Sequence, residues 1–141
     1  NAMKAKTTYL VILAIILIAG INLTGCAENT DLIGVGPIKK LELKPVDKSM
    51  SDRGKVAFDA KCVACHKFDV KVVGPPLNGV TKRRKPEWIM NMILNPEQMT
   101  KENIIAKQLL AEHLTQMTFQ NVTQDEARAI LEYFRVNDGD K

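Results

Sequence analysis

The sequence of 141 residues has few of the side chains that hold metals or close disulfides: three cysteines and two histidines. A structural zinc site normally needs a second pair of Cys or His ligands at similar spacing, and only one such pair exists, at Cys62 and Cys65. A thioredoxin-like dithiol would sit in a strand–helix–strand pattern, and the chain shows no alternation of strand and helix signals. These absences disfavour both kinds of cysteine site.

Excess charge is also lacking. The full chain has a formal net charge of +4, and removal of residues 1–25, which hold Lys4 and Lys6 and no acid, leaves 18 basic and 16 acidic residues, or +2. So small a net charge gives no reason to expect nucleic acid or an anionic membrane as a partner.

What is present is the stretch Cys62-Val63-Ala64-Cys65-His66. Two cysteines separated by two residues and followed at once by histidine form the attachment signature of c-type haem. Each thiol adds to one vinyl group of the porphyrin, and one turn of chain spans the fixed distance between the two vinyls. His66 then lies under the ring, where a ring nitrogen binds iron as the proximal ligand. The motif therefore predicts one covalent haem c with its iron.

The N-terminus predicts export. Asn1 and Ala2 precede Met3 and are interpreted as a vector remnant. Residues 9–19 form an apolar run, too short for the roughly 20 residues of a membrane span and typical of a signal-peptide core. The following Leu23-Thr24-Gly25-Cys26 resembles a bacterial lipobox, which implies cleavage before Cys26, a lipid on its thiol and a membrane-tethered chain facing the periplasm. An uncleaved anchor helix and a plain secretory signal are the alternatives.

We expect three segments: the remnant and signal peptide at residues 1–25, the lipidated cysteine and a tether at 26–50, and the haem domain at 51–141. Residues 27–50 contain two glycines and two prolines and few helix signals. As a flexible coil they would average about 25–30 Å end to end. Alternatively, Ile38, Leu41 and Leu43 lie on the domain as an ordered strap, and the sequence leaves both possibilities open.

Apolar residues recur at helical spacing throughout the domain, which predicts an all-α fold. Ser51 is the expected N-cap of the first helix, Pro86 suits the first position of the second, and Thr100 is the expected cap of the third. Thr123 and Glu126 form a capping box that begins the last helix. The expected helices cover residues 51–62, 86–94, 100–113 and 123–136.

Gly54 and Phe58 ahead of the Cys-x-x-Cys-His motif, and the stretch Gly-Pro-Pro-Leu-Asn-Gly-Val at residues 74–80, resemble class I mono-haem cytochromes c. The resemblance covers about residues 51–136. It implies the class I cytochrome c fold, in which the N- and C-terminal helices cross closely at Gly54 around the haem. It also implies that the carbonyl of Pro75 accepts a hydrogen bond from the proximal imidazole and that Leu77 packs on the haem face.

Residues 82–85 are a basic run, Lys-Arg-Arg-Lys. Arg83 or Arg84 suits a haem propionate because a planar guanidinium fits a carboxylate, and the lysines would steer an acidic redox partner. A solvated loop is the alternative. The resemblance implies that Trp88, the only tryptophan, reaches the haem edge; plain core packing is the alternative for this ring.

The second axial ligand of the iron has three candidates: Met117, Met99 and His113. The resemblance places a distal methionine in the loop before the last helix, which favours Met117. Thr118 stands where the family usually has proline. Met99 and His113 remain alternatives.

A six-coordinate iron has no position for a substrate. The resemblance therefore implies a one-electron carrier rather than an enzyme, with no small-molecule substrate. It would receive electrons from a quinol-oxidising complex and pass them to a terminal oxidase or a nitrous-oxide-type reductase. A peroxidase-like enzyme and a haem-based gas sensor, each with a displaceable sixth ligand, are the alternative functions.

Overall fold

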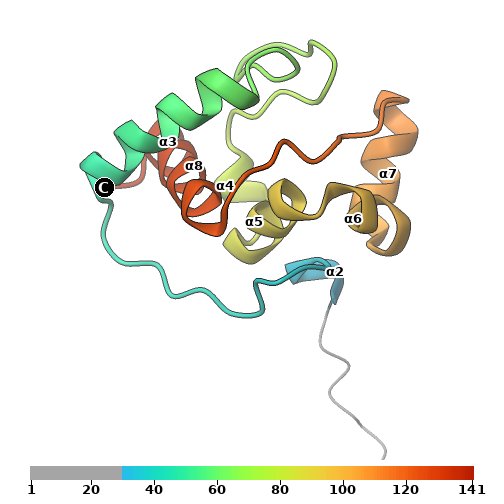
Figure 1. Ribbon diagram of the computed structural model, residues 1–141, viewed down its shortest axis with the longest axis horizontal. Coiled ribbons are helices and arrows are strands. Elements are labelled where there is room, and N and C mark those ends of the chain that lie inside the picture. The colour runs from blue at the N-terminus through green and yellow to red at the C-terminus, as the bar shows by residue number, and fades with distance from the viewer. Residues whose placement is uncertain (1–29) are drawn as a thin grey trace, which may run out of the picture.

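The computed structural model describes residues 30–141 (Figure 1), and within this range it contains helices and no strand. The expected all-α fold is therefore confirmed. No helix of the described part is long and apolar enough to cross a membrane. The helices are α2 (Thr30–Ile33), α3 (Lys48–Lys61), α4 (Val80–Arg83), α5 (Pro86–Leu94), α6 (Pro96–Glu102), α7 (Ile104–His113) and α8 (Gln124–Asn137).

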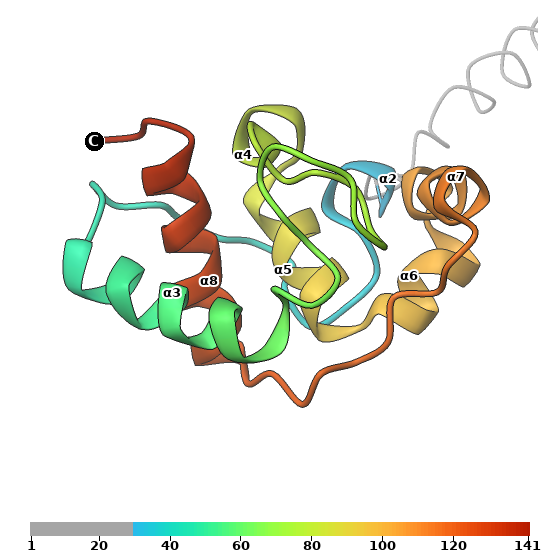
Figure 2. The same cartoon turned by 90° about the horizontal axis from the view of Figure 1, so that it is seen from above.

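Helices α3 and α8 lie side by side and form the main helix contact (Figures 1 and 2). Gly54 stands at their closest approach, because a Cβ atom built on it would lie 1.9 Å from the backbone oxygen of Ala129. No side chain fits in that space. The close crossing expected from Gly54 is therefore confirmed.

An aromatic cluster extends the crossing toward the segment after α3. The Phe58 ring of α3 packs edge-on against Phe134 of α8 at a centroid distance of 5.7 Å. The rings of Phe68 and Tyr133 meet edge to face at a centroid distance of 5.4 Å. The Phe68 ring centroid lies 5.6 Å from that of Phe58. Such pairs contribute about 0.5–1.5 kcal/mol beyond their buried area. The cluster thus holds the segment around Phe68 against the two long helices.

The first helix begins earlier than expected. Asp47, not Ser51, is its N-cap, and the Asp47 carboxylate accepts a hydrogen bond from the backbone N–H of Met50 at 3.0 Å. Ser51 lies inside α3 and is buried. The expectation for Ser51 was wrong because Asp47 is held in place by a distant contact: its own backbone N–H donates to Glu132 of α8.

The expected helix from Thr100 to His113 is two helices. Pro96 occupies the start of α6, and Thr100 lies within α6, where its hydroxyl donates to the carbonyl of Pro96. Asn103 is the cap of α7, and its side-chain oxygen accepts from the N–H of Ala106 at 3.1 Å. The expectation for Thr100 was wrong because Asn103 takes the capping role.

The sequence signals for the starts of the other two expected helices are confirmed. Helix α5 covers residues 86–94 with Pro86 at its start. The capping box of α8 forms in both directions, with the Thr123 hydroxyl accepting from the N–H of Glu126 and the Glu126 carboxylate accepting from the N–H of Thr123.

Residues 34–47, which we call the strap, lie along the domain as an ordered segment (Figure 1). Buried Asn91 of α5 bonds the chain at this point three times. Its amide donates to the carbonyls of Ile33 at 2.9 Å and Ile38 at 2.8 Å, and its oxygen accepts from the N–H of Ile38. Glu87 accepts from the N–H of Leu41 at 2.9 Å. Ile38 and Leu41 are partly buried against the core, whereas Leu43 is exposed.

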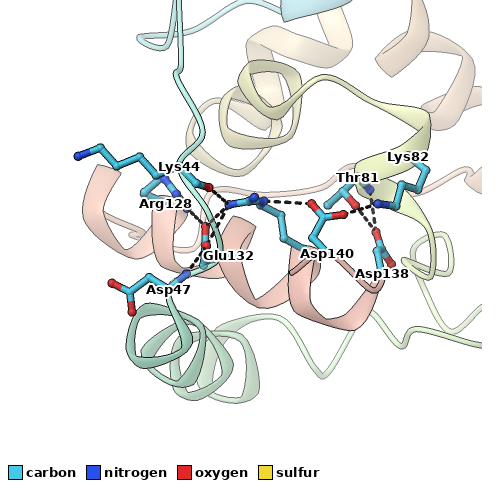
Figure 3. A network of polar contacts seen from close by, with 9 residues as sticks. Lys44, Asp47, Thr81, Lys82, Arg128, Glu132, Asp138 and Asp140 are labelled. Atoms are coloured by element: carbon cyan, nitrogen blue, oxygen red, sulfur yellow. Dashed lines mark hydrogen bonds and ion pairs between the residues drawn. The ribbon is translucent and has the colours of Figure 1, made fainter.

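The far end of the strap is bonded to α8 (Figure 3). Arg135 donates to the carbonyl of Lys44 at 3.1 Å, and Glu132 accepts from the N–H of Asp47 at 2.9 Å. Glu132 is fully buried and also pairs with Arg128 and Arg135. Burial raises the pKa of this carboxyl, but the hydrogen bonds from Asp47 and Arg128 outweigh it, so the pKa lies below its ordinary value. The strap is thus held at both ends by buried polar side chains.

The C-terminal turn holds the start of α4 in a similar way (Figure 3). The Asp138 carboxylate accepts from the backbone N–H groups of Gly79 at 2.7 Å and Thr81 at 2.9 Å, and from the Thr81 hydroxyl at 2.6 Å. Burial raises the pKa of Asp138, but the hydrogen bonds from Thr81 and Gly79 outweigh this effect, so the pKa lies below its ordinary value. The end of the chain therefore fixes the position of α4.

Gly54→Ala should destabilise the domain by about 3 kcal/mol or more, because α3 and α8 must separate to admit the methyl group. Chemical denaturation of the haem-loaded protein measures this change. Val56→Ala, at a position 70% exposed on the same helix, is the control and should change stability by less than about 0.5 kcal/mol. Equal effects of the two substitutions would contradict the close crossing.

Asn91→Ala should loosen the strap, because backbone groups of Ile33 and Ile38 lose their partner. Leaving such groups without hydrogen bonds costs about 1–3 kcal/mol each. In amide hydrogen exchange the N–H of Ile38 should be protected in the native protein and exchange at least tenfold faster in the variant. Fast exchange of both Ile38 and Leu41 in the native protein would show that the strap is not bound.

Candidate functional site

A mostly apolar cavity of about 280 Å³ lies between the segment 62–79, helix α5, helix α7 and the loop 114–122. It gathers residues that are up to 76 positions apart in the sequence, from Phe58 to Phe134. All the expected haem-contacting residues in the described part line it: Cys62, Cys65, His66, Pro75, Leu77, Arg83, Arg84, Trp88 and Met117. Cys26 lies outside the described residues.

The two cysteines follow directly on α3. Cys62 is the C-cap of that helix, and its carbonyl accepts from the N–H groups of Cys65 at 3.1 Å and His66 at 3.0 Å. This tight turn brings both thiols and the imidazole to the cavity. Both thiols are free. Burial raises the pKa of the Cys62 thiol, with a small opposing effect of Lys61.

The His66 ring is fixed by the segment that follows it. Its Nδ1 lies 3.1 Å from the carbonyl oxygen of Pro75, and because a carbonyl only accepts, Nδ1 carries the proton. Burial lowers the pKa of His66, although the bond to Pro75 opposes this effect. The ring is therefore a neutral imidazole whose Nε2 has a free lone pair, the form that binds a metal.

Gly74 makes room for this ring. A Cβ atom at Gly74 would lie 2.3 Å from Cε1 of His66. The segment around it is held by backbone bonds from Gly74 to Cys65 at 3.0 Å and from Leu77 to Lys67 at 3.0 Å. The position of the imidazole is thus set by rigid backbone on one side and by the Cys65 turn on the other.

The basic run has more internal partners than the sequence suggests. Arg83 donates to the backbone carbonyls of Asn78 and Pro76, and Lys82 pairs with Asp140. The Arg84 guanidinium stacks over the Trp88 ring, 5.5 Å from its centre. Arg83 and Arg84 border the cavity, but both also bind elements of the domain.

Trp88 is buried, with 4% of its surface exposed, and its ring lines the cavity. Its indole N–H donates to the side-chain oxygen of Asn103 at 3.0 Å. Trp88 therefore packs in the core and faces the cavity at once. Asn103 was not among the expected site residues; the signal for it was a polar residue directly before the apolar positions of α7.

The three candidates for the distal ligand are placed differently. Met117 is half-buried in the loop 114–122 and lines the cavity. Met99 is fully buried outside the cavity lining, and its sulfur accepts from the N–H of Val35 at 2.9 Å. His113 lines the cavity at the end of α7. Its buried Nδ1 atom has no hydrogen-bond partner.

This donor set fits a covalent haem. Two free thiols and a neutral imidazole come from one turn, and a thioether and a second imidazole line the same apolar cavity. A buried polar atom without a partner, such as Nδ1 of His113, marks a place where a group other than the protein is expected. In the described part of the chain no group of three His, Cys, Asp or Glu side chains is arranged to hold a metal ion, so a porphyrin with axial ligands suits the site better than a metal held by these side chains alone.

Comparisons with known proteins agree with this geometry. Residues 51–137 match the family described as Cytochrome c. A solved structure of cytochrome c from Rhodothermus marinus is 39% identical, covers 77% of this chain and 95% of its own, and gives a TM-score of 0.74. An engineered cytochrome c from the same organism, Rma TDE, is 38% identical, with coverage of 79% and 97% and a TM-score of 0.74. No curated protein sequence matched.

A structure of Rma TDE bound to a carbene intermediate is also similar, with 37% identity, coverage of 79% and 97%, and a TM-score of 0.72. The family match spans more than half of the chain, and the similar structures are covered almost completely. The chain therefore belongs to the cytochrome c family, with a haem c whose iron serves electron transfer.

Proposed function

We propose that this chain is a one-electron carrier of the bacterial cell envelope whose haem iron is held by His66 and Met117. The observation that carries this proposal is the cavity, which both side chains line while the sulfur of Met99 is bonded to the strap. When bound, haem c supplies a one-electron iron couple. Two protein ligands leave no position for a substrate, which favours a carrier over a peroxidase-like enzyme or a gas sensor.

The residues around the cavity each have a defined part in this function. Cys62 and Cys65 hold the group covalently, and the Pro75 carbonyl keeps the His66 ring in one tautomer and orientation. Leu77 and Trp88 exclude water from the apolar cavity. Because a thioether is a soft ligand that favours ferrous iron, ligation by Met117 raises the potential.

A raised potential suits the oxidising end of a respiratory chain. We therefore propose a quinol-oxidising complex as electron donor and a terminal oxidase or nitrous-oxide-type reductase as acceptor. Lys67 and Lys71, which are exposed in the segment 62–79, would steer an acidic partner. Lys61 and Lys82 contribute less, since each is paired with an acidic residue of its own chain.

The cellular location rests on the N-terminal sequence. A signal peptide in residues 1–25 and a lipid on Cys26 would place the domain on the periplasmic side of a membrane. Haem attachment of this kind needs an exported, reduced dithiol, which agrees with the signal peptide.

One observation favours a second ligand set. The unpartnered Nδ1 of His113 lines the same cavity as Met117. Ligation by His66 and His113 would give a lower potential and low-potential partners. Met117 is preferred because it lies in a loop, which can turn its sulfur toward the iron, whereas His113 is fixed at the end of a helix.

The ligand is tested by the weak near-infrared band that sulfur-to-iron coordination gives in the ferric protein. The native protein should show the band, and Met117→Ala should abolish it. Met99→Ala and His113→Ala, the matched controls, should keep it. Met117→His should leave the haem attached and lower the reduction potential sharply. Loss of the band in Met99→Ala but not in Met117→Ala would overturn the assignment.

Carbon monoxide distinguishes a carrier from an enzyme or sensor. The reduced native protein should bind carbon monoxide slowly or not at all at neutral pH, because Met117 occupies the sixth position. Met117→Ala should bind it readily, as followed by the shift of the Soret band. Rapid binding by the native protein would count against a simple carrier.

A further inference from the structure

The strap, which connects the N-terminal segment to the domain, is bonded to the domain along its length. Four side chains of the domain accept hydrogen bonds from backbone N–H groups of the strap between Val35 and Asp47: Met99, Asn91, Glu87 and Glu132. The strap starts at a close contact with Met99. A Cβ atom at Gly34, whose φ is +78°, would lie 2.6 Å from the Met99 sulfur. These residues therefore do not act as a flexible tether.

Helix α5 separates the strap from the haem cavity. Glu87 and Asn91, one turn apart, bond the strap. Trp88 and Met92, which are also one turn apart, line the cavity. Figure 1 shows the same arrangement: α2 lies on one side of α5, and the green segment 62–79 lies on the other. The haem-attachment segment thus faces away from the place where the described chain begins.

The length of chain before the domain then limits its distance from an anchor. Cys26 lies four positions before Thr30, so the two are at most about 14 Å apart even in a fully extended chain. A flexible coil over residues 27–50 would instead average about 25–30 Å and reach much farther when extended.

We propose that the face formed by α2 and the strap lies against the lipid bilayer surface, with the haem-attachment segment directed into the aqueous phase. The proposal rests on the lipid at Cys26 that the proposed function assigns. Redox partners then approach from the aqueous side, opposite the membrane.

The exposed residues of this face suit a bilayer surface. Leu32 of α2 and Leu43 of the strap are 43% and 40% exposed, and apolar side chains of this kind enter the interfacial region of a bilayer. Lys39 and Lys40 are exposed between them, and lysines near a membrane are attracted by anionic headgroups. Lys40 also pairs with Glu42, so Lys39 is the better probe.

The test compares the amine reactivity of Lys39 and Lys71 in the acylated, haem-loaded protein bound to phosphatidylglycerol-containing vesicles. Both side chains are exposed in the protein, but Lys39 lies in the strap and Lys71 in the segment 62–79. A membrane-impermeant acylating reagent and mass spectrometry give the ratio of their labelling. Two variants accompany the native chain: one with a flexible Gly/Ser linker of about 24 residues inserted before Thr30, and one with the same linker after Lys141.

In the native protein Lys39 should be labelled several-fold less than Lys71. The linker before Thr30 should restore Lys39 labelling, because it frees the domain from the surface. The linker after Lys141, which is exposed and follows the contacts of Asp140 with Lys82 and Arg135, should leave the native ratio unchanged. Equal ratios in the native protein and in the variant with the linker before Thr30 would overturn the proposed orientation.

Intact mass separates this result from failure of the anchor itself. An acylated Cys26 with equal labelling ratios would refute the orientation and leave the lipid anchor and the carrier function standing. A mature chain without acyl groups at Cys26 would refute both the anchor and the orientation, while the near-infrared band would still report on the haem ligands.

Discussion

The close approach of α3 and α8 at Gly54 is the contact on which the rest of the structure depends. It lets the Phe58 and Phe134 rings meet, and through Phe68 it holds the segment that presents Pro75 to the His66 ring. The haem-attachment turn begins at the end of α3, so the direction of that helix sets where both thiols lie. A small change in the packing of α3 against α8 would therefore displace the residues on the proximal side of the cavity.

Buried polar side chains also fix a segment outside the apolar core, the strap. Asn91 and Glu132 are fully buried, and each uses its hydrogen-bonding capacity on backbone groups of the N-terminal segment rather than on its own neighbours alone. A buried amide or carboxylate that lost these partners would be costly. The core is thus complete only when the strap is in place, which makes residues 34–47 part of the domain in an energetic sense.

Sequence patterns predicted those features of the fold that depend on residues close together in the sequence. Pro86 and the Thr123–Glu126 pair marked helix starts correctly, and the family resemblance placed the helix crossing at Gly54 correctly. They did not identify Asp47 and Asn103 as caps, because Asp47 is bonded to Glu132, 85 positions away, and Asn103 also binds the indole of Trp88. The strap was undecided for the same reason: its glycines and prolines indicate a coil, and the contacts that order it come from α5 and α8. In the site, the Cys-x-x-Cys-His spacing predicted the attachment residues and the family resemblance implied Pro75, Leu77, Trp88 and Met117, whereas the contact of Met99 with Val35 required the fold.

The placement of the methionines has a consequence for oxidative damage. The sulfur of Met99 is fully buried and already accepts a hydrogen bond, so oxidants reach it only when the strap opens. Met117 lies half-buried in an exposed loop. Conversion of a thioether to a sulfoxide makes it polar and removes its soft character. When its sulfur is not bound to iron, Met117 would therefore be oxidised before Met99, and the sulfoxide would no longer supply the soft ligand that raises the reduction potential.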